Sequence, residues 1–321
     1  MNLKLIGQDV IASVLKMPRA IELMREAYAE LSAGSVDSPL RTALVNEVGT
    51  VLYKPAYSKA AEILCVKVIS VFPGNAEKGL PVIPGVIVVN SAETGMPVAI
   101  LEAGYLTSLR TGAATGLATD LFAKKEAKVA ALFGTGGQSR HQLEAMLCAR
   151  DFETVYVFSR NAENAERFCR ENADIARGCQ LVPNAERTVL KLCDVITTAT
   201  TSAVALFEWD EVADDVHVNA IGALGPMRTE LTAETLLQSA VVVDDREACL
   251  REAGEICLMR QAGLVGDDYY PAEIGELLDG PDLQGVPTVF RSVGNAAQDL
   301  LCSAEILRIT EAQNLGVIAQ F

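Results

Sequence analysis

The spacing of apolar residues near the start of the chain predicts an amphipathic helix. Pro18 can occupy the first turn of such a helix, and Gly34 can end it. Between them, apolar residues recur every three or four positions, at Ile21, Met24, Tyr28 and Leu31. This period places them on one helix face, which we expect to pack against a core.

The next segment has a different pattern, in which short β-branched runs are separated by glycine and proline. The runs are residues 42–45, 50–53, 63–71, 86–89 and 97–101. Strands this close together leave no room for crossover helices, so they indicate an antiparallel or mixed sheet. The Gly- and Ala-rich segment 108–123 then predicts a tightly packed helix.

From residue 129 onward, strand-like and helix-like segments alternate. The strand-like runs are residues 129–133, 154–158, 195–198, 216–221 and 241–243, and helical segments begin at residues 138 and 162. Such alternation predicts parallel strands joined by crossover helices, hence an α/β fold with a Rossmann-like, doubly wound domain. We expect this domain to span residues 119–299. Residues 1–118 with 300–321 would form a smaller α+β domain, against which a last helix over residues 296–315 packs.

Composition and charge restrict the classes of partner. Half of the residues are apolar, enough to bury the cores of about two domains. The chain has 27 Lys and Arg against 42 Asp and Glu, a net charge of −15, so its surface should repel nucleic acid and anionic membranes. No signal peptide or membrane span is expected, because the densest apolar run, residues 82–89, contains Pro84 and Gly85.

The cysteines and histidines point to a cytoplasmic protein without a metal site. Eight cysteines are scattered without a close pair, which is typical of reduced thiols. The two histidines, His141 and His217, do not lie beside a cysteine at zinc spacing.

A glycine-rich turn between a predicted strand and a predicted helix indicates dinucleotide binding. It consists of Gly134, Thr135, Gly136, Gly137 and Gln138, followed by Ser139. Glycines at such a turn let backbone N–H groups approach a pyrophosphate, which the helix N-terminus also attracts. The spacing is G-x-G-x-x-S, so a serine replaces the usual third glycine. A purely structural turn is the alternative.

The residues after the next strand favour NADP as the cofactor, with NAD as the alternative. An acidic residue at this place would bind the ribose 2′-hydroxyl of NAD, whereas Ser159 followed by Arg160 suits a 2′-phosphate. Arg160 could instead pair with Glu163 or Glu166 and contact no cofactor. Thr198 ends another predicted strand, where its hydroxyl could line the cofactor site or cap the following turn.

Several separate motifs resemble the ornithine cyclodeaminase/μ-crystallin family, which includes alanine dehydrogenases and ketimine reductases. The resemblance covers nearly the whole chain. Its motifs are Pro39-Leu40-Arg41, Lys67 followed by Pro73-Gly74-Asn75, Thr94-Gly95-Met96-Pro97, Leu109-Arg110-Thr111-Gly112-Ala113, Gly137-Gln138, His217-Val218-Asn219-Ala220-Ile221-Gly222, and Ser292-Val293-Gly294 with Asp299. The resemblance implies that Thr111, Val293 and Gly294 contact the cofactor, and that a homodimer forms through the sheet of the first domain.

The resemblance also implies that Arg41, Lys67 and Arg110 hold a substrate carboxylate facing the nicotinamide across an interdomain cleft. The residue types agree with this role, because these cations lie in or beside apolar segments and need a counter-charge if buried. A substrate carboxylate could supply it. Internal ion pairs with Glu47, Glu62 or Glu102, or exposure to solvent, are the alternatives.

One departure from the family pattern favours imine reduction over attack on an amino acid. The family's cyclodeaminases and alanine dehydrogenases have an aspartate where this chain has Leu224, and leucine cannot take a proton. We therefore expect NAD(P)H-dependent reduction of a small imine that bears a carboxylate, such as pyrroline- or piperideine-2-carboxylate. Asp244, Asp245 or Asp299 could replace the missing base, so an ornithine cyclodeaminase or amino-acid dehydrogenase remains an alternative. A non-catalytic, NADPH-dependent binder of small molecules is another.

Overall fold

The computed structural model describes residues 2–176, 178–223, 225–281, 283 and 285–320. The chain divides into two compact units, one of residues 1–110 with 295–321 and the other of residues 111–294. The boundaries expected from the sequence, after residues 118 and 299, lie inside helices α3 (Ala103–Phe122) and α9 (Ala296–Ala312). In the structure the first unit also contains residues 295–299, and residues 111–118 belong to the second unit.

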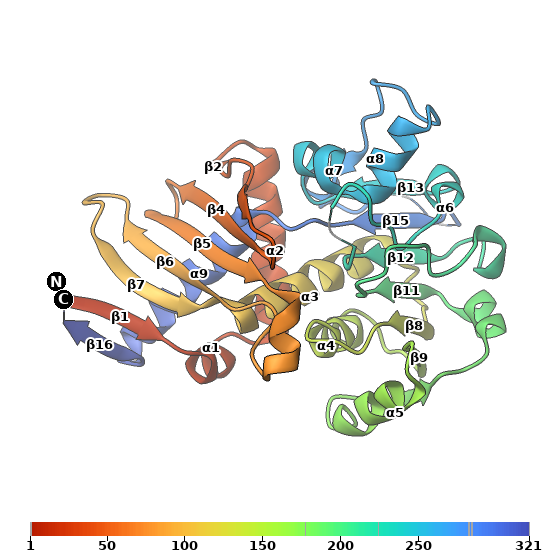
Figure 1. Cartoon of the computed structure of the whole chain (residues 1–321), viewed down its shortest axis with the longest axis horizontal. Coiled ribbons are helices and arrows are strands. Elements are labelled where there is room, and N and C mark those ends of the chain that lie inside the picture. Colours follow the sequence, from red (N-terminus) through yellow and green to blue (C-terminus); the bar gives the residue numbers. More distant parts are fainter. Residues whose placement is uncertain (1, 177, 224, 282, 284, 321) are drawn as a thin grey trace. The chain divides into compact units, whose positions relative to one another are not determined.

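The first unit is built on an eight-stranded mixed sheet (Figure 1). Neighbouring strands follow the order β16-β1-β7-β6-β5-β4-β2, with β3 also paired to β4. All pairs are antiparallel except β1 with β7, so the expectation of an antiparallel or mixed sheet is confirmed. The strands are β1 (Asn2–Ile6), β2 (Val36–Asp37), β3 (Thr42–Val45), β4 (Thr50–Ser58), β5 (Ile63–Val71), β6 (Gly85–Ser91), β7 (Pro97–Glu102) and β16 (Val317–Gln320).

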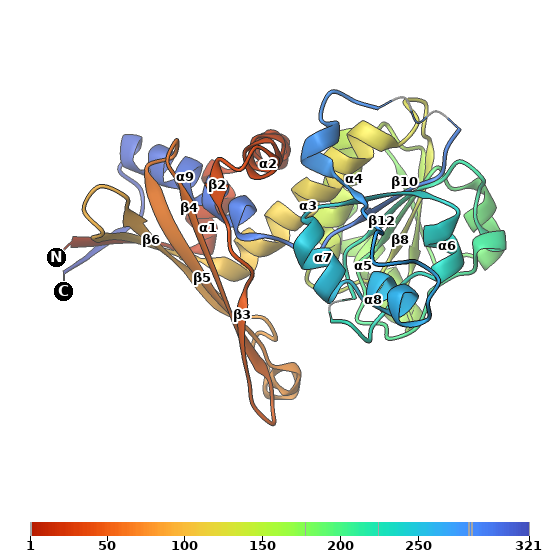
Figure 2. The ribbon, with the colours of Figure 1, turned by 90° about the horizontal axis from the view of Figure 1, so that it is seen from above.

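Two helices of the first unit cover one face of this sheet. Helix α9 packs against β4, β5 and β6, and α2 (Met17–Ser32) packs against α9. Figure 2 shows both helices on the same side of the strands, and α1 (Gln8–Val14) also contacts α9. Side chains alternate along β4 and β5, so every second residue is buried beneath α9.

The opposite face of the sheet carries apolar side chains that are only partly covered. Leu5, Tyr57, Leu64 and Val86 have 37%, 37%, 39% and 41% of their surface exposed. They come from four different strands, and the strand register places all four on the same face of the sheet. Patches of this kind mark interaction sites in soluble proteins.

The second unit contains an eight-stranded sheet in which every pairing is parallel. The order is β10-β9-β8-β11-β12-β15-β13-β14, so the chain runs outward from β8 to β10 and then crosses back to β11. This reversal is the mark of a doubly wound sheet, and it confirms the Rossmann-like fold. The strands are β8 (Val129–Phe133), β9 (Thr154–Phe158), β10 (Gln180–Pro183), β11 (Val195–Thr198), β12 (His217–Ala220), β13 (Ala240–Val243), β14 (Ala272–Glu273) and β15 (Thr288–Arg291).

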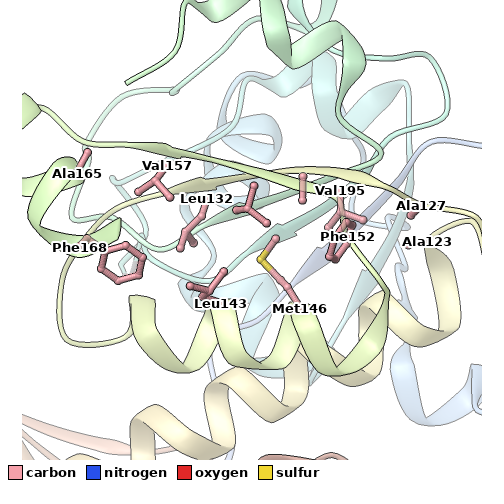
Figure 3. Close-up of a cluster of buried hydrophobic side chains, with 12 residues drawn as sticks. Ala123, Ala127, Leu132, Leu143, Met146, Phe152, Val157, Ala165, Phe168 and Val195 are labelled. Carbon is pink, nitrogen blue, oxygen red and sulfur yellow. The ribbon is translucent and has the colours of Figure 1, made fainter. Parts of the chain in front are cut away.

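A buried apolar cluster joins this sheet to its helices (Figure 3). Leu143 and Met146 of α4 (Ser139–Ala149) lie against Leu132, Val157 and Val195 of three strands. Phe168 of α5 (Ala162–Glu171) is 6% exposed in the same cluster. This packing fixes the start of α4, and therefore the glycine-rich turn before it.

Short helices complete the second unit, namely α6 (Ala233–Leu237), α7 (Arg246–Glu252) and α8 (Gly254–Gln261). Among the residues that the structure describes, none of the helices is both long enough and apolar enough to cross a membrane.

Candidate functional site

The first unit buries a cluster of cationic side chains around one carboxylate. Lys67 lies on β5 and points to the side covered by α9, where its Nζ is 2.6 Å from Asp299 Oδ2. Arg110 of α3 approaches the same carboxylate, with Nε 3.2 Å from Oδ1. The three side chains are 1%, 0% and 5% exposed. Two buried cations therefore share one carboxylate.

Hydrogen bonds hold this cluster in place. Arg110 also donates to Gln298 Oε1 at 2.7 Å, and Gln298 donates to the Tyr28 hydroxyl at 2.6 Å. Gln298 is the third residue of α9 and forms a capping box with Asn295 at the start of that helix. Lys67 Nζ donates to Thr107 Oγ1 at 3.3 Å. Because four elements supply these groups, the cations are positioned before any ligand arrives.

Lys54 is a further member of this cluster, and the sequence analysis missed it. It lies on β4 directly opposite Lys67 of β5, and it is 5% exposed. The pKa of Lys54 is held well below its usual value by burial and by the positive charges of Lys67, Arg41 and Arg110. Arg41 is thus electrostatically part of the cluster, although it is less deeply buried.

The protonation states in the cluster follow from burial and from these neighbours. Burial and the Arg110 charge lower the pKa of Lys67 to about 8, although Asp299 opposes the shift. The pKa of the Asp299 carboxyl falls below its usual value, because Lys67 and Arg110 outweigh the effect of its burial. Asp299 is therefore an anion, and Lys67 and Arg110 both favour its ionised form.

In the second unit, the glycine-rich turn follows β8 at the point where the sheet reverses its winding. Gly134 has φ +108°, and a Cβ there would lie 2.4 Å from the carbonyl oxygen of Ala199. The fold itself therefore requires glycine here, because the segments that follow the carboxyl ends of β8 and β11 come close together. At Gly136 and Gly137, by contrast, a Cβ would meet no described atom within 4 Å. This open space fits the close approach of a pyrophosphate to the backbone.

Buried polar groups at the start of α4 lack protein partners within the described residues. The Ser139 hydroxyl and both polar atoms of the Gln142 amide are buried without a hydrogen bond. Buried polar groups are nearly always satisfied, so a bound ligand or water is expected here. Thr135 Oγ1 donates to Ser159 Oγ at 3.3 Å, which ties the glycine-rich turn to the end of β9.

A buried glutamate organises the loops that follow β11 and β12. Glu230 is 0% exposed and accepts hydrogen bonds from the backbone N–H groups of Thr200, Gly222 and Ala223. The Thr198 hydroxyl also donates to Glu230, at 2.9 Å. Sequence inspection could not find Glu230, because only the fold brings it to these loops. Thr198 therefore helps to position the loops, and its contact with a cofactor stays a prediction.

The aspartates considered as replacement bases have other partners. Asp244 accepts hydrogen bonds from Ser292 Oγ and from the N–H groups of Val293 and Gly294. Asp245 caps α7 by accepting from Ala248 N, and burial raises its pKa to about 6. Asp244 thus shapes the loop that contains Val293 and Gly294.

The remaining predicted residues are placed as follows. Thr111 is 8% exposed on α3. Arg160 is exposed, and within the described part of the chain no ion pair joins it to Glu163 or Glu166. Leu224 lies outside the described residues. Lys67 and Arg110 pair with Asp299. Glu102, one of the carboxylates considered as an alternative internal partner, accepts from the N–H groups of Gly104 and Tyr105 at the start of α3.

Comparisons with a family model and with individual known proteins point to the same family. The model of the family described as "Ornithine cyclodeaminase/mu-crystallin family" matches residues 5–310. A Delta(1)-pyrroline-2-carboxylate reductase of Bacillus cereus is 31% identical over 96% of this chain and 97% of its own.

Solved structures of such proteins have the same fold over nearly all of the chain. A Delta(1)-pyrroline-2-carboxylate reductase of Thermococcus litoralis, in complex with NADH and L-proline, has a TM-score of 0.93 at 31% identity and covers 98% of this chain and 99% of its own. An archaeal alanine dehydrogenase dimer with bound NAD has a TM-score of 0.93 at 32% identity and covers 100% of both chains.

Proposed function

Because the chain belongs to the ornithine cyclodeaminase/mu-crystallin family, we propose that it reduces small imines that bear a carboxylate, using a nicotinamide dinucleotide. The substrate class includes cyclic ketimines such as pyrroline-2-carboxylate. The reaction adds a hydride to the imine carbon and leaves an amino acid.

The observation that carries this proposal is the excess of buried positive charge around Asp299. Lys67 and Arg110 are both almost fully buried, yet they share a single carboxylate. Burying an incompletely balanced cation is costly, so the site is organised to receive an anion. A guanidinium can grip a carboxylate through two parallel hydrogen bonds, and Arg110 with Lys67 and Arg41 would hold that of the substrate.

The second unit supplies groups that fit a dinucleotide. The open backbone at Gly136 and Gly137 and the N-terminus of α4 would bind the pyrophosphate. Thr135 and Gln138 complete that turn, while Thr111, Thr198, Val293 and Gly294 would line the nicotinamide end. When bound, the reduced nicotinamide supplies the hydride.

Lys67 is the group best suited to handle the proton of the reaction. Its pKa of about 8 allows both protonation states near neutral pH. The protonated amine stabilises the substrate carboxylate and can give a proton to the imine nitrogen. Asp299 keeps the Lys67 ammonium in position through their 2.6 Å contact.

We further propose that the cofactor is NADPH in preference to NADH. The exposed Arg160 guanidinium follows Ser159 at the end of β9, where a Rossmann fold recognises the adenosine ribose. A guanidinium suits a 2′-phosphate. The two solved relatives contain NADH and NAD, so the preference has to be measured directly.

The test is NADPH or NADH oxidation at 340 nm with pyrroline-2-carboxylate. We expect turnover by the unmodified protein, and a Lys67→Ala variant should lose it while it keeps its affinity for NADPH. Lys59→Ala, at an exposed lysine after β4, is the matched control. Absence of turnover with a panel of carboxylate-bearing imines would contradict the proposal.

Oxidation of an amino acid is the second candidate, because the alanine dehydrogenase likeness favours it. With Lys67 partly deprotonated near its pKa of about 8, this amine could accept the proton of a substrate ammonium group. Reduction of NAD(P) by L-alanine or L-proline at alkaline pH identifies this direction. Ammonia release from ornithine would identify a cyclodeaminase, and tight NADPH binding without turnover would identify a binder.

We also propose that the protein is a homodimer joined through the sheet of the first unit. The partly exposed apolar face with Tyr57, Leu64 and Val86 would be covered by the same face of a second copy. The archaeal alanine dehydrogenase, which resembles this chain over its whole length, is described as a dimer.

A further inference from the structure

Among the described residues, the Lys67 ammonium has two oxygen partners. Its Nζ is 2.6 Å from Asp299 Oδ2, and it donates a hydrogen bond to Thr107 Oγ1 at 3.3 Å. Thr107 lies on α3 three positions before Arg110, and residues at this spacing share one face of a helix. Thr107 and Arg110 therefore approach the pair of Lys67 and Asp299 from the same helix.

The proposed reduction consumes one proton in each turnover. An imine, NAD(P)H and one proton give an amine and NAD(P)⁺, and Lys67 is the group proposed to deliver the proton. Delivery leaves a neutral amine on Lys67, which has to take up a proton before it can act again. A route for protons from solvent to Lys67 Nζ is therefore a requirement of the mechanism.

The two partners of Lys67 differ in their ability to supply a proton. The Lys67 and Asp299 side chains are 1% and 0% exposed, so this pair does not exchange protons with solvent directly. The positive charges of Lys67 and Arg110 also hold the pKa of Asp299 below its usual value, so its carboxylate carries no proton. Thr107 is 8% exposed, and a hydroxyl can donate and accept hydrogen bonds at the same time. Of the two partners, Thr107 is thus the one that has both solvent contact and a transferable proton.

We propose that Thr107 acts through Lys67, as a positioning residue whose hydroxyl relays a solvent proton to this lysine after each reduction. This inference rests on the proposed imine reduction. In the ammonium form of Lys67, Nζ donates to Thr107 Oγ1, as observed. In the amine form the hydrogen bond reverses, and the Thr107 O–H donates to the lone pair of Nζ.

The relay is balanced with reactants already named. An N–H bond of the Lys67 ammonium breaks, and its proton binds the lone pair of the imine nitrogen. Hydride from NAD(P)H forms the C–H bond at the imine carbon, and the C=N π electrons become the lone pair of the product amine. The Thr107 O–H bond then breaks as its proton moves to Nζ, while the same oxygen forms a new O–H bond with a proton from solvent. Thr107 and Lys67 are thereby returned to their starting states.

The test compares the first turnover with the later ones in Thr107→Val, which lacks the hydroxyl but has a similar shape. At pH 7, below the Lys67 pKa of about 8, the first turnover begins with protonated Lys67 and needs no relay. Later turnovers have to wait for reprotonation. Stopped-flow oxidation of NADPH with pyrroline-2-carboxylate gives both rates. We expect the ratio of the first-turnover rate to the steady-state rate to be at least about 10-fold larger in the variant than in the unmodified protein.

Two further variants of α3 serve as controls. Thr107→Ser keeps a hydroxyl and should keep the ratio of the unmodified protein. Ser108→Ala removes the neighbouring hydroxyl, which donates to the Gly104 carbonyl at 3.2 Å, and should also keep that ratio. KM for NADPH and the melting temperature should stay close to those of the unmodified protein in all variants. Thr107→Ala, a second variant without the hydroxyl, should show the same increase as Thr107→Val and carries the test if valine disturbs folding.

The outcomes separate the relay from the proposed function. An unchanged ratio in a folded variant without the hydroxyl would show that protons reach Lys67 without Thr107, and it would overturn the relay while imine reduction stands. Equal losses in first and later turnovers, or an increased ratio in Thr107→Ser, would also overturn it. No reduction of any imine by the unmodified protein would overturn both.

Discussion

Asp299 and Lys67 form an ion pair of 2.6 Å in which neither side chain has more than 1% of its surface exposed. Arg110 weakens this pair, because its guanidinium attracts the Asp299 carboxylate and repels the Lys67 ammonium. Burial is the main cause that lowers the Lys67 pKa, to about 8, and the repulsion by Arg110 adds to it. The ion pair therefore holds a lysine whose proton can be released near physiological pH.

The first prediction concerns pH. In the proposed reaction Lys67 binds the substrate carboxylate in its protonated form, so kcat/KM for pyrroline-2-carboxylate should fall as the pH rises through about 8. In a Lys67→Arg variant this alkaline limb should disappear, because a guanidinium keeps its charge. The substrate's own titration is common to both proteins and cancels in the comparison. Identical alkaline limbs would assign the titration to another group.

The lowered pKa of Lys67 should also affect stability, but in the opposite direction: the free energy of unfolding should rise with pH where kcat/KM falls. In the unfolded chain Lys67 has its ordinary pKa of 10.5, whereas in the folded protein it is about 8. Between these values the unfolded chain binds a proton that the folded protein has released, so the Lys67 contribution to the free energy of unfolding rises with pH over that window. Comparing urea unfolding of the unmodified protein and Lys67→Met at several pH values isolates this contribution.

The second prediction separates two glycines of one turn. Gly136→Ala should leave the melting temperature unchanged, since a Cβ there meets no described atom within 4 Å, but it should weaken dinucleotide binding by about 10-fold. Gly134→Ala should instead destabilise the protein, because its φ is +108° and its Cβ would meet the Ala199 carbonyl at 2.4 Å. Equal effects of the two variants on stability would contradict the distinction. Calorimetry and fluorescence titration with NADPH provide the two readouts.

The third prediction concerns Glu230, which positions the loops after β11 and β12. Its carboxylate accepts from three backbone N–H groups and from Thr198. In Glu230→Gln, an NH₂ group would face some of these donors, so we expect a loss of about 2–4 kcal/mol in unfolding free energy. Cofactor affinity should fall with it. Glu166→Gln, at an exposed position of α5, is the control and should change neither quantity.

Regular segments of the chain could be predicted closely from the sequence, whereas the full set of residues around Asp299 could not. The strands at residues 63–71, 129–133 and 154–158 have the expected limits, because their apolar runs are bounded by turn residues. The strand expected to end at residue 53 continues to Ser58. Pro55 lies between the parts of β4 that pair with β3 and β2, where a missing N–H is tolerated.

Lys54 was missed because the strand predicted from the sequence ended at residue 53, one position before it. Once β4 extends to Ser58, Lys54 alternates in phase with the buried Leu52 and Ala56, and its burial follows. The pairing of Arg110 with Asp299 could not be predicted from local sequence patterns, because 189 positions separate the two residues along the chain. Only the packing of α9 on the sheet brings them together. Family resemblance identified Arg110 and Lys67, whereas the shared carboxylate required the fold.

The fourth prediction tests the cofactor preference. Arg160→Ala should raise KM for NADPH by about 10-fold or more and leave KM for NADH nearly unchanged, because only NADPH has the 2′-phosphate. Arg167→Ala is the matched control, since Arg167 is an exposed arginine on the following helix that donates to Asn164. Parallel changes with both cofactors would show that Arg160 does not recognise the 2′-phosphate.

The last prediction concerns assembly. Val86 is 41% exposed on the partly covered sheet face. Its strand β6 lies beside β5, which contains Leu64, and β5 pairs in turn with β4, which contains Tyr57. In a homodimer built on this face, Val86→Glu would place two carboxylates in an apolar interface, so light scattering should show a monomer where the unmodified protein is a dimer. Val204→Glu, at a 68% exposed position of the second unit, should keep the dimer. Dissociation by Val204→Glu and not by Val86→Glu would place the interface on the second unit, and the apolar face of the sheet would then need another explanation.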